Sequence, residues 1–335
     1  MTNSALTTGS VRPSRGWRIA LSLRRLAIFL LATAYALVLV NLPLFEFRDR
    51  TFYLEYYAPY SDQILQRQAE QGLLPLLANE PVWLLLNITL ASVLQPEDVV
   101  RVFIFLPAFV VAWALLRSKP QHIFWLVLIL LYPGVIKNHV IHLRQGVAIA
   151  VFLFGVLATR QRGLRWILIG VAPFIHSSFF FVIVIMLLAH LSRRLRFAPD
   201  LSILVFALAT AAVLLSLEWV ALALGARQAT EYQLLGGSEV SGINFIFWGL
   251  MLGIMTMEGK DYLRRHRFEV AAVILYLGTY FFTPITARVF ESVLPLVLIA
   301  GAELTQWRGL IFKSAIVAFG VVLWITGRAL DILLL

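Results

Sequence analysis

Cysteine and the common nucleotide-binding motifs are absent from this chain of 335 residues. Without cysteine, the chain can form no disulfide, no iron–sulfur cluster and no thiolate zinc site. It also contains no P-loop, no GxGxxG, no DxD and no HExxH motif. These absences argue against a nucleotide as donor or fuel.

Charged residues are also scarce. They make up 14% of the chain, whereas 60% is hydrophobic and the mean hydropathy is +0.85. Soluble domains carry about 25% charged residues. Because backbone groups in lipid must be satisfied within their own segment, apolar runs of about 15 to 25 residues predict membrane helices. The sequence therefore predicts an all-α, polytopic transmembrane helical bundle.

We expect about nine full spans and two short re-entrant or broken helical segments. The expected spans are 22–44, 99–117, 121–136, 145–159, 200–224, 242–257, 268–283, 289–306 and 311–333. The short segments are 80–94 and 166–191, the second of which is interrupted by Pro173. As domains, we expect a basic cytoplasmic N-terminus over 1–21 and a single membrane domain over 22–335, with an outer-face loop over 45–79.

The distribution of cations predicts the orientation. The net charge is +10, and the cations cluster in short breaks between apolar runs, which favours membrane topology over nucleic-acid binding as their cause. If both short segments are re-entrant, five cations between 96 and 165 face the cytoplasm and three face outward; if both are single spans, that ratio reverses. The positive-inside rule favours the re-entrant arrangement. The five are Arg117, Lys119, Arg160, Arg162 and Arg165, and the three are Arg101, Lys137 and Arg144.

The stretch KNHVIHLRQG (137–146) places several polar side chains beside an apolar run. His139 and His142 are three residues apart and could share a helix face, but no Asp or Glu lies nearby to complete a zinc site. A plain interfacial loop is one interpretation. The other rests on Arg144 at the mouth of a membrane helix, where a guanidinium suits a phosphate.

Further polar residues interrupt apolar segments. His176, after Pro173, is either a structural histidine at a kink or a residue that lines water. Arg288 and Glu291 form either an intrahelical salt bridge or an anion contact that Glu291 orients. The loop 45–79 mixes acids with aromatic residues, which suits sugar stacking or an interfacial belt. The re-entrant arrangement collects these groups on the outer side, so we expect an outward-facing polar cavity.

Four stretches together resemble the EpsG-like, Wzy-type polysaccharide polymerases, in order and in spacing. They are EPVWLLLN (80–87), HLRQGVAIA (142–150), FIHSS (174–178) and ARVFESVLPL (287–296). The chain departs from the family pattern at one position. The pattern has an Asn about three residues before the Arg of the RQ pair, but Ile141 stands there and the nearest Asn, Asn138, lies three residues earlier. The resemblance implies an enzyme of the bacterial inner membrane that joins undecaprenyl-diphosphate-linked oligosaccharide units on the outer face, with undecaprenyl diphosphate as the leaving group.

This chemistry needs a general base and cations for the diphosphate. The candidate bases, in order of preference, are His176, His142 and Glu80. The candidate substrate contacts are Arg144, Arg288, Gln145, Arg227 and Glu291. No cofactor or metal is required, because arginines can carry the diphosphate charge. The implied partners are the lipid-linked oligosaccharide, the bilayer, and a chain-length regulator and flippase.

Two other functional classes stay open. One is a flippase or transporter of lipid-linked oligosaccharides, which would also need a cationic, aromatic cavity. The chain shows no repeat with a period of 20–50 residues, whereas such transporters usually have internal symmetry. The other is an O-antigen ligase or a membrane acyltransferase, which shares the lipid-linked substrate class or the His/Arg chemistry.

Overall fold

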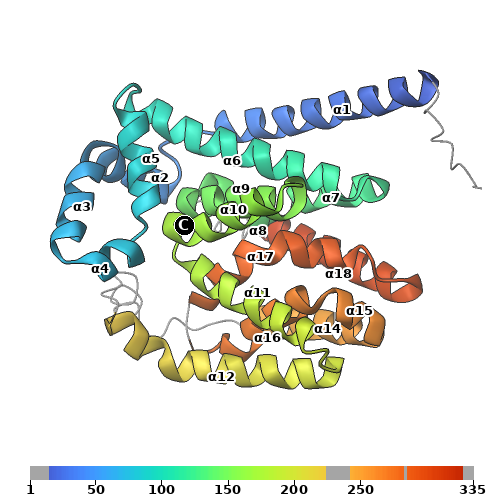
Figure 1. The fold of residues 1–335 in the computed structure, drawn as a ribbon. Helices are drawn as coiled ribbons and strands as arrows, with labels where there is room; N and C mark the ends of the chain where they lie inside the picture. Colours follow the sequence, from blue (N-terminus) through green and yellow to red (C-terminus); the bar gives the residue numbers. More distant parts are fainter. Residues whose placement is uncertain (1–14, 224–241, 283–284, 327–335) are drawn as a thin grey trace, which may run out of the picture.

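The computed structural model describes residues 15–223, 242–282 and 285–326 (Figure 1). Over these ranges the chain folds into helices joined by short turns, and they contain no strand. This confirms the prediction of an all-α fold. Residue Arg227, a predicted substrate contact, lies outside the described residues.

Three helices are long and apolar enough to cross a membrane within the described ranges. They are Ser22–Val40 within α1 (Arg15–Val40), α6 (Pro96–Ser118) and α18 (Gln306–Ile325). A bent helix pair over 120–140 makes a fourth if it counts as one span. The other apolar helices are shorter, so the predicted number of nine full spans is not confirmed.

The predicted span 121–136 is broken in the structure. After η2 (Pro120–His122), α7 (Ile123–Leu130) and α8 (Pro133–Val140) meet at an angle of 66°. Pro133 disfavours helical geometry at the preceding residue, and Tyr132 is extended, with φ −69° and ψ 130°. A second break at Ile141 and His142 precedes α9 (Leu143–Leu153), which continues as η3 (Phe154–Ala158).

The predicted short segment 166–191 forms two helices, α10 (Arg162–Ile175) and α11 (Ser178–Arg194). His176 is extended and Ser177 completes the turn between them. The other short segment, 80–94, contains α5 (Pro81–Ala91), which packs against α10. The two segments that the sequence marked as irregular therefore meet in space.

The predicted loop 45–79 is largely helical. It contains α2 (Arg48–Phe52), η1 (Tyr53–Tyr57), α3 (Ala58–Glu70) and α4 (Leu73–Ala78). With α5, these elements form a cap at one end of the bundle, on the left in Figure 1. Buried Arg50 fixes the cap to the break after α8: its Nε donates to the Val140 carbonyl at 2.8 Å and its Nη1 to that of Pro43 at 2.8 Å.

The remaining helices complete the bundle. They are α12 (Pro199–Ala223), α14 (Ile243–Met257), α15 (Lys260–Arg265), α16 (Arg267–Thr279) and α17 (Ile285–Gly301). At the end opposite the cap, Glu303 contacts Lys119 at 2.6 Å and His266 at 3.2 Å, which joins three interhelical turns. We call this the basic end, defined by Lys119, His266 and Arg308.

Glu258 links α14 to the start of α18 at the basic end. Its carboxylate accepts hydrogen bonds from Arg308 Nε at 2.7 Å and from the Thr305 backbone N–H at 3.1 Å. Burial alone would raise the pKa of Glu258, but hydrogen bonds from Thr305 and Arg308 outweigh it and hold that pKa below its ordinary value. The carboxylate therefore stays ionised and binds the two turns together.

Candidate functional site

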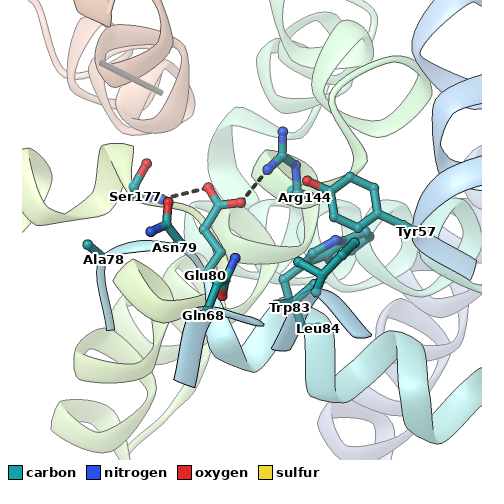
Figure 2. A pocket seen from close by; sticks show the side chains of 10 residues that line it. Tyr57, Gln68, Ala78, Asn79, Glu80, Trp83, Leu84, Arg144 and Ser177 are labelled. Atoms are coloured by element: carbon teal, nitrogen blue, oxygen red, sulfur yellow. Dashed lines mark hydrogen bonds and ion pairs between the residues drawn. The ribbon is translucent and has the colours of Figure 1, made fainter. Parts of the chain in front are cut away.

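A buried ion pair joins Glu80 to Arg144 at the junction of the cap and the bundle (Figure 2). Glu80 is 3% exposed, and its backbone is left-handed, with φ 63°, immediately before Pro81. One carboxylate oxygen accepts from Arg144 Nη1, and the other accepts from the Ser177 backbone N–H at 3.1 Å. The strained backbone of Glu80 thus directs its carboxylate to α9 and to the α10–α11 turn.

A small pocket lies against this pair. The Arg144 guanidinium lies 5.2 Å from the centre of the Tyr57 ring. Three buried polar atoms around the pocket have no hydrogen-bond partner among the described residues: Arg144 Nε, Trp83 Nε1 and Gln68 Oε1. Unmet donors and an acceptor beside aromatic rings suit a polar ligand. The full lining is Tyr57, Ile64, Gln68, Ala78, Asn79, Glu80, Trp83, Leu84, Arg144 and Ser177.

His176 ends a chain of hydrogen-bonded side chains next to this pair. Its Nδ1 lies 2.7 Å from Ser178 Oγ, which lies 3.1 Å from Ser292 Oγ. The Ser292 hydroxyl contacts the Arg288 carbonyl at 2.9 Å, and Gln145 Nε2 donates to that carbonyl at 2.7 Å and to Ser292 Oγ at 3.1 Å. This series of hydrogen bonds links α9, α11 and α17 around the imidazole.

This chain of hydroxyls is compatible with either neutral tautomer of His176. If Nδ1 donates to Ser178, each hydroxyl donates to the next group, the Arg288 carbonyl is the final acceptor, and Nε2 keeps its lone pair. In the opposite direction, Gln145 donates to Ser292, Ser292 to Ser178, and Ser178 to Nδ1, so the ring proton lies on Nε2. The Ser178 backbone N–H, 3.3 Å from Nδ1, favours this direction because it also donates to Nδ1. The imidazole can therefore change tautomer without leaving a hydroxyl unsatisfied.

Glu291 pairs with Lys137 rather than with Arg288. The Lys137 Nζ lies 3.0 Å from Glu291 Oε1, and the second carboxylate oxygen, which is buried, has no hydrogen-bond partner among the described residues. The positive charge of Arg288 also acts on Glu291. The salt bridge considered between Arg288 and Glu291 is not formed in the described part of the chain. Arg288 is left without an ion pair there.

Seven of the predicted site residues lie at the cap end of the bundle. Glu80 pairs with Arg144 and accepts from the backbone N–H of Ser177, next to His176. The backbone carbonyl of Arg288 ends the chain of hydroxyls that begins at His176. Gln145 and Glu291 are held as described above. The sequence analysis did not select Lys137, Ser178, Ser292, Tyr57 and Trp83. A signal existed for three of these, since Trp83, Ser178 and Ser292 fall within the family-like stretches.

The described residues contain no group of three His, Cys, Asp or Glu side chains that could hold a metal ion. The cations that could bind an anion are instead guanidinium groups, on Arg144 and Arg288, and the ammonium group of Lys137. Glu80 neutralises Arg144 and Glu291 neutralises Lys137, whereas Arg288 has no carboxylate partner among the described residues. These cations are of the kind that binds an anionic, polar ligand.

Comparison with known families decides the wider identity. The model of the EpsG family matches residues 26–332. The chain belongs to the EpsG family. The match includes all four family-like stretches and each predicted site residue, and membership indicates a polysaccharide polymerase-like membrane protein. No curated protein and no solved structure matches this EpsG family chain.

Proposed function

We propose that this EpsG family protein is a polysaccharide polymerase that joins undecaprenyl-diphosphate-linked oligosaccharide units on the outer face of the bacterial inner membrane. The growing chain is the donor, and a terminal sugar hydroxyl of the next lipid-linked unit is the acceptor. The observation that carries the proposal is the pocket around Arg144, where Glu80 and the Tyr57 ring orient the guanidinium and the positive charges of Arg144 and Arg288 both act on His176.

Arg144 and Arg288 would bind the diphosphate of the donor. Glu80 holds one Nη of Arg144, and the Tyr57 ring lies beside the guanidinium, which leaves Nε for a phosphate oxygen. Such pre-orientation matters because charge develops on the leaving diphosphate as its bond to the sugar breaks. Arg288, with no carboxylate partner in the described chain, supplies a second positive charge.

His176 is the preferred general base. The acceptor hydroxyl would attack the anomeric carbon of the donor sugar, its proton would pass to His176 Nε2, and the bond to diphosphate would break with its electron pair on the leaving group. His142 is second in preference. Glu80 is third, because both of its carboxylate oxygens already accept hydrogen bonds and its geometry suits the orientation of Arg144.

A flippase would use a similar cavity but would not form a glycosidic bond. An O-antigen ligase or membrane acyltransferase would use another acceptor. The tests below therefore follow both the polymer and the position of the lipid-linked units.

The first test replaces the planar guanidinium group of Arg144 while keeping a positive charge. Arg144→Lys retains a cation for Glu80 but loses the planar, bidentate geometry, so we expect polymer to fall at least about tenfold. Arg144→Ala should abolish polymer, with single lipid-linked units accumulating on the outer face. Polymer is measured by gel electrophoresis, and the position of the units by their accessibility to an external glycosidase.

The matched control is Arg67→Ala on α3, an exposed arginine that is not part of the pocket lining. It should leave polymer unchanged. Because Arg144→Ala leaves the Glu80 carboxylate buried without its partner, the amount of each variant in the membrane is measured as well. Normal polymer from a well-expressed Arg144→Ala variant would contradict the proposal, and units confined to the inner face would indicate a flippase.

A further inference from the structure

A shallow apolar groove lies between α11 and α12, on the side of the bundle that α12 borders in Figure 1. Both helices pack on α16, which forms its floor. The lining contains one polar side chain, Thr210, whose hydroxyl donates to the Phe206 carbonyl at 2.8 Å. The groove therefore offers no free polar atom and suits a hydrocarbon chain. Its lining is Phe181, Val184, Ile185, Leu188, Phe206, Ala209, Thr210, Val213, Ala271 and Leu275.

A polar cluster closes the groove toward the basic end. One helical turn beyond Leu188, Phe206 and Ala271, the three helices carry Ser192, Ser202 and Arg267, respectively. Arg267 Nη1 donates to Ser192 Oγ at 2.9 Å, and Ser192 and Ser202 are 2.6 Å apart. The groove thus runs directly into a hydrogen-bonded cluster that contains a guanidinium.

The positive charge of Arg267 is not neutralised within this cluster. The side chain is only 5% exposed, its Nη2 donates to the Phe197 carbonyl at 2.7 Å, and its Nε has no hydrogen-bond partner in the described part of the chain. No carboxylate pairs with it among those residues. A buried charge without a counter-ion is unfavourable, so the cluster favours an anion nearby.

Exposed cations follow Ser192 and precede Arg267 in the chain, and Arg193 and Arg264 are close enough for their charges to act on Arg267. Two nearby cations have carboxylate partners: Arg264 pairs with Asp261 and Lys260 with Asp200. The others form no ion pair among the residues that the structure describes. These unpaired arginines are Arg193, Arg194, Arg196 and Arg265.

We propose that the groove and its arginine cluster bind one anionic phospholipid from the leaflet at the basic end. Its phosphate lies against Arg193 and Arg267, and one acyl chain occupies the groove between α11 and α12. The occupant must be apolar over the length of the groove and anionic at one end, and a phospholipid has both properties in the required order. Basic pockets between membrane helices bind lipid headgroups in the same way.

The test measures lipid binding to the full chain in detergent by native mass spectrometry. The two probes are phosphatidylglycerol and phosphatidylcholine with identical acyl chains. The wild-type chain should bind phosphatidylglycerol about tenfold more tightly, because several cations contribute to the headgroup site. Arg193→Gln should weaken that binding about fivefold, the effect of one interfacial cation, whereas Arg24→Gln on α1, also exposed, should not change it.

A second pair of variants tests the groove without touching the arginines. Val184→Trp fills the groove from a position that is 44% exposed, and Leu187→Trp adds the same bulk on α11 at a 51% exposed position outside the lining. Only Val184→Trp should lose the preference for phosphatidylglycerol. Equal binding of both lipids by the wild-type chain would overturn the proposal, as would equal effects of the two tryptophans. With undecaprenyl phosphate as an additional probe, selective loss of its binding by Val184→Trp, with phosphatidylglycerol binding retained, would overturn the proposal and assign the groove to the substrate lipid.

Discussion

At the scale of residues, the polar side chains of the stretch 137–144 divide among different partners. Lys137 pairs with Glu291 on α17, Asn138 donates to the Gly134 carbonyl within its own helix, and Arg144 pairs with Glu80. Only Arg144 lines the pocket. One short stretch therefore supplies a link between helices, a satisfied amide and a cation held ready for an anion.

The role of His176 can be separated from that of its supporting hydroxyl. His176→Gln removes the general base, so the initial rate of polymerisation should fall by about 10²- to 10⁴-fold. Ser178→Ala keeps the imidazole but removes one hydrogen bond to Nδ1, so the rate should fall about tenfold. The measurement is in vitro polymerisation of a defined lipid-linked unit by purified protein.

The matched control for Ser178→Ala is Ser118→Ala, since that hydroxyl donates only to the Leu115 carbonyl of its own helix. It should leave the rate unchanged. Full activity of Ser178→Ala would show that the hydroxyl chain does not orient the histidine. Full activity of His176→Gln would show that His176 is not the general base and would leave His142 and Glu80 as the candidates.

At the scale of elements, the sequence predicted helices well and their breaks poorly. The apolar runs at α1, α6 and α18 have the length and hydropathy that a spanning helix requires. The break inside 121–136 was missed, because an apolar run with Pro133 is compatible with a kink or with two helices. The second break, at Ile141 and His142, depends on a distant contact that no local pattern shows: Arg50 donates to the Val140 carbonyl at the end of α8.

The candidate site shows the same limit. The residue types around Glu80, Arg144 and His176 were predictable, because polar groups in apolar segments are unfavourable unless they have partners or line water. Their pairing was not, since Glu80 and Ser177 are 97 positions apart and their contact depends on how α5 packs against α10. The preference of Glu291 for Lys137 over Arg288 was likewise decided by the packing of α17 on α8.

Gly146 allows α8 and α9 to approach each other closely. A substitution at this position therefore tests whether the site needs the break between the two helices. A Cβ at this position would lie 2.1 Å from the Asn138 carbonyl oxygen, which is backbone and cannot rotate away. Gly146→Ala should force α9 and Arg144 away from α8, destabilise the protein by about 1–3 kcal/mol and reduce polymer. Thermal unfolding in detergent and the polymer assay measure the two effects.

Gly170→Ala on α10 is the control for Gly146→Ala. No atom lies within 4 Å of the Cβ that it would add, so it should be neutral or stabilise the helix by about 0.5–1 kcal/mol. If the two variants unfold at the same temperature and make the same polymer, the close approach of α8 and α9 is not needed for the site.

At the scale of the whole molecule, the helices carry the site and the basic clusters at opposite ends. From Arg144, α9 and η3 extend about 22 Å before the chain turns back into α10, which returns to His176. This length is less than the hydrocarbon core of about 30 Å. The pocket and the break after α8 place polar side chains at the cap ends of these helices. The apolar part of the helices, between the site and the basic end, is therefore shorter than a full span.

This arrangement places Gln161, between η3 and α10, at the end opposite Gln71 in the cap, and both side chains are exposed. The chain has no native cysteine, so single cysteines report each position without interference. A membrane-impermeant maleimide should label Gln71→Cys in intact spheroplasts, but Gln161→Cys and Lys260→Cys only after the membrane is permeabilised, because the arginines around 160–165 favour the cytoplasmic side. Labelling of Gln161→Cys and Gln71→Cys from the same side would contradict the re-entrant topology, and labelling of Gln161→Cys alone in intact spheroplasts would place the Arg144 pocket on the cytoplasmic face.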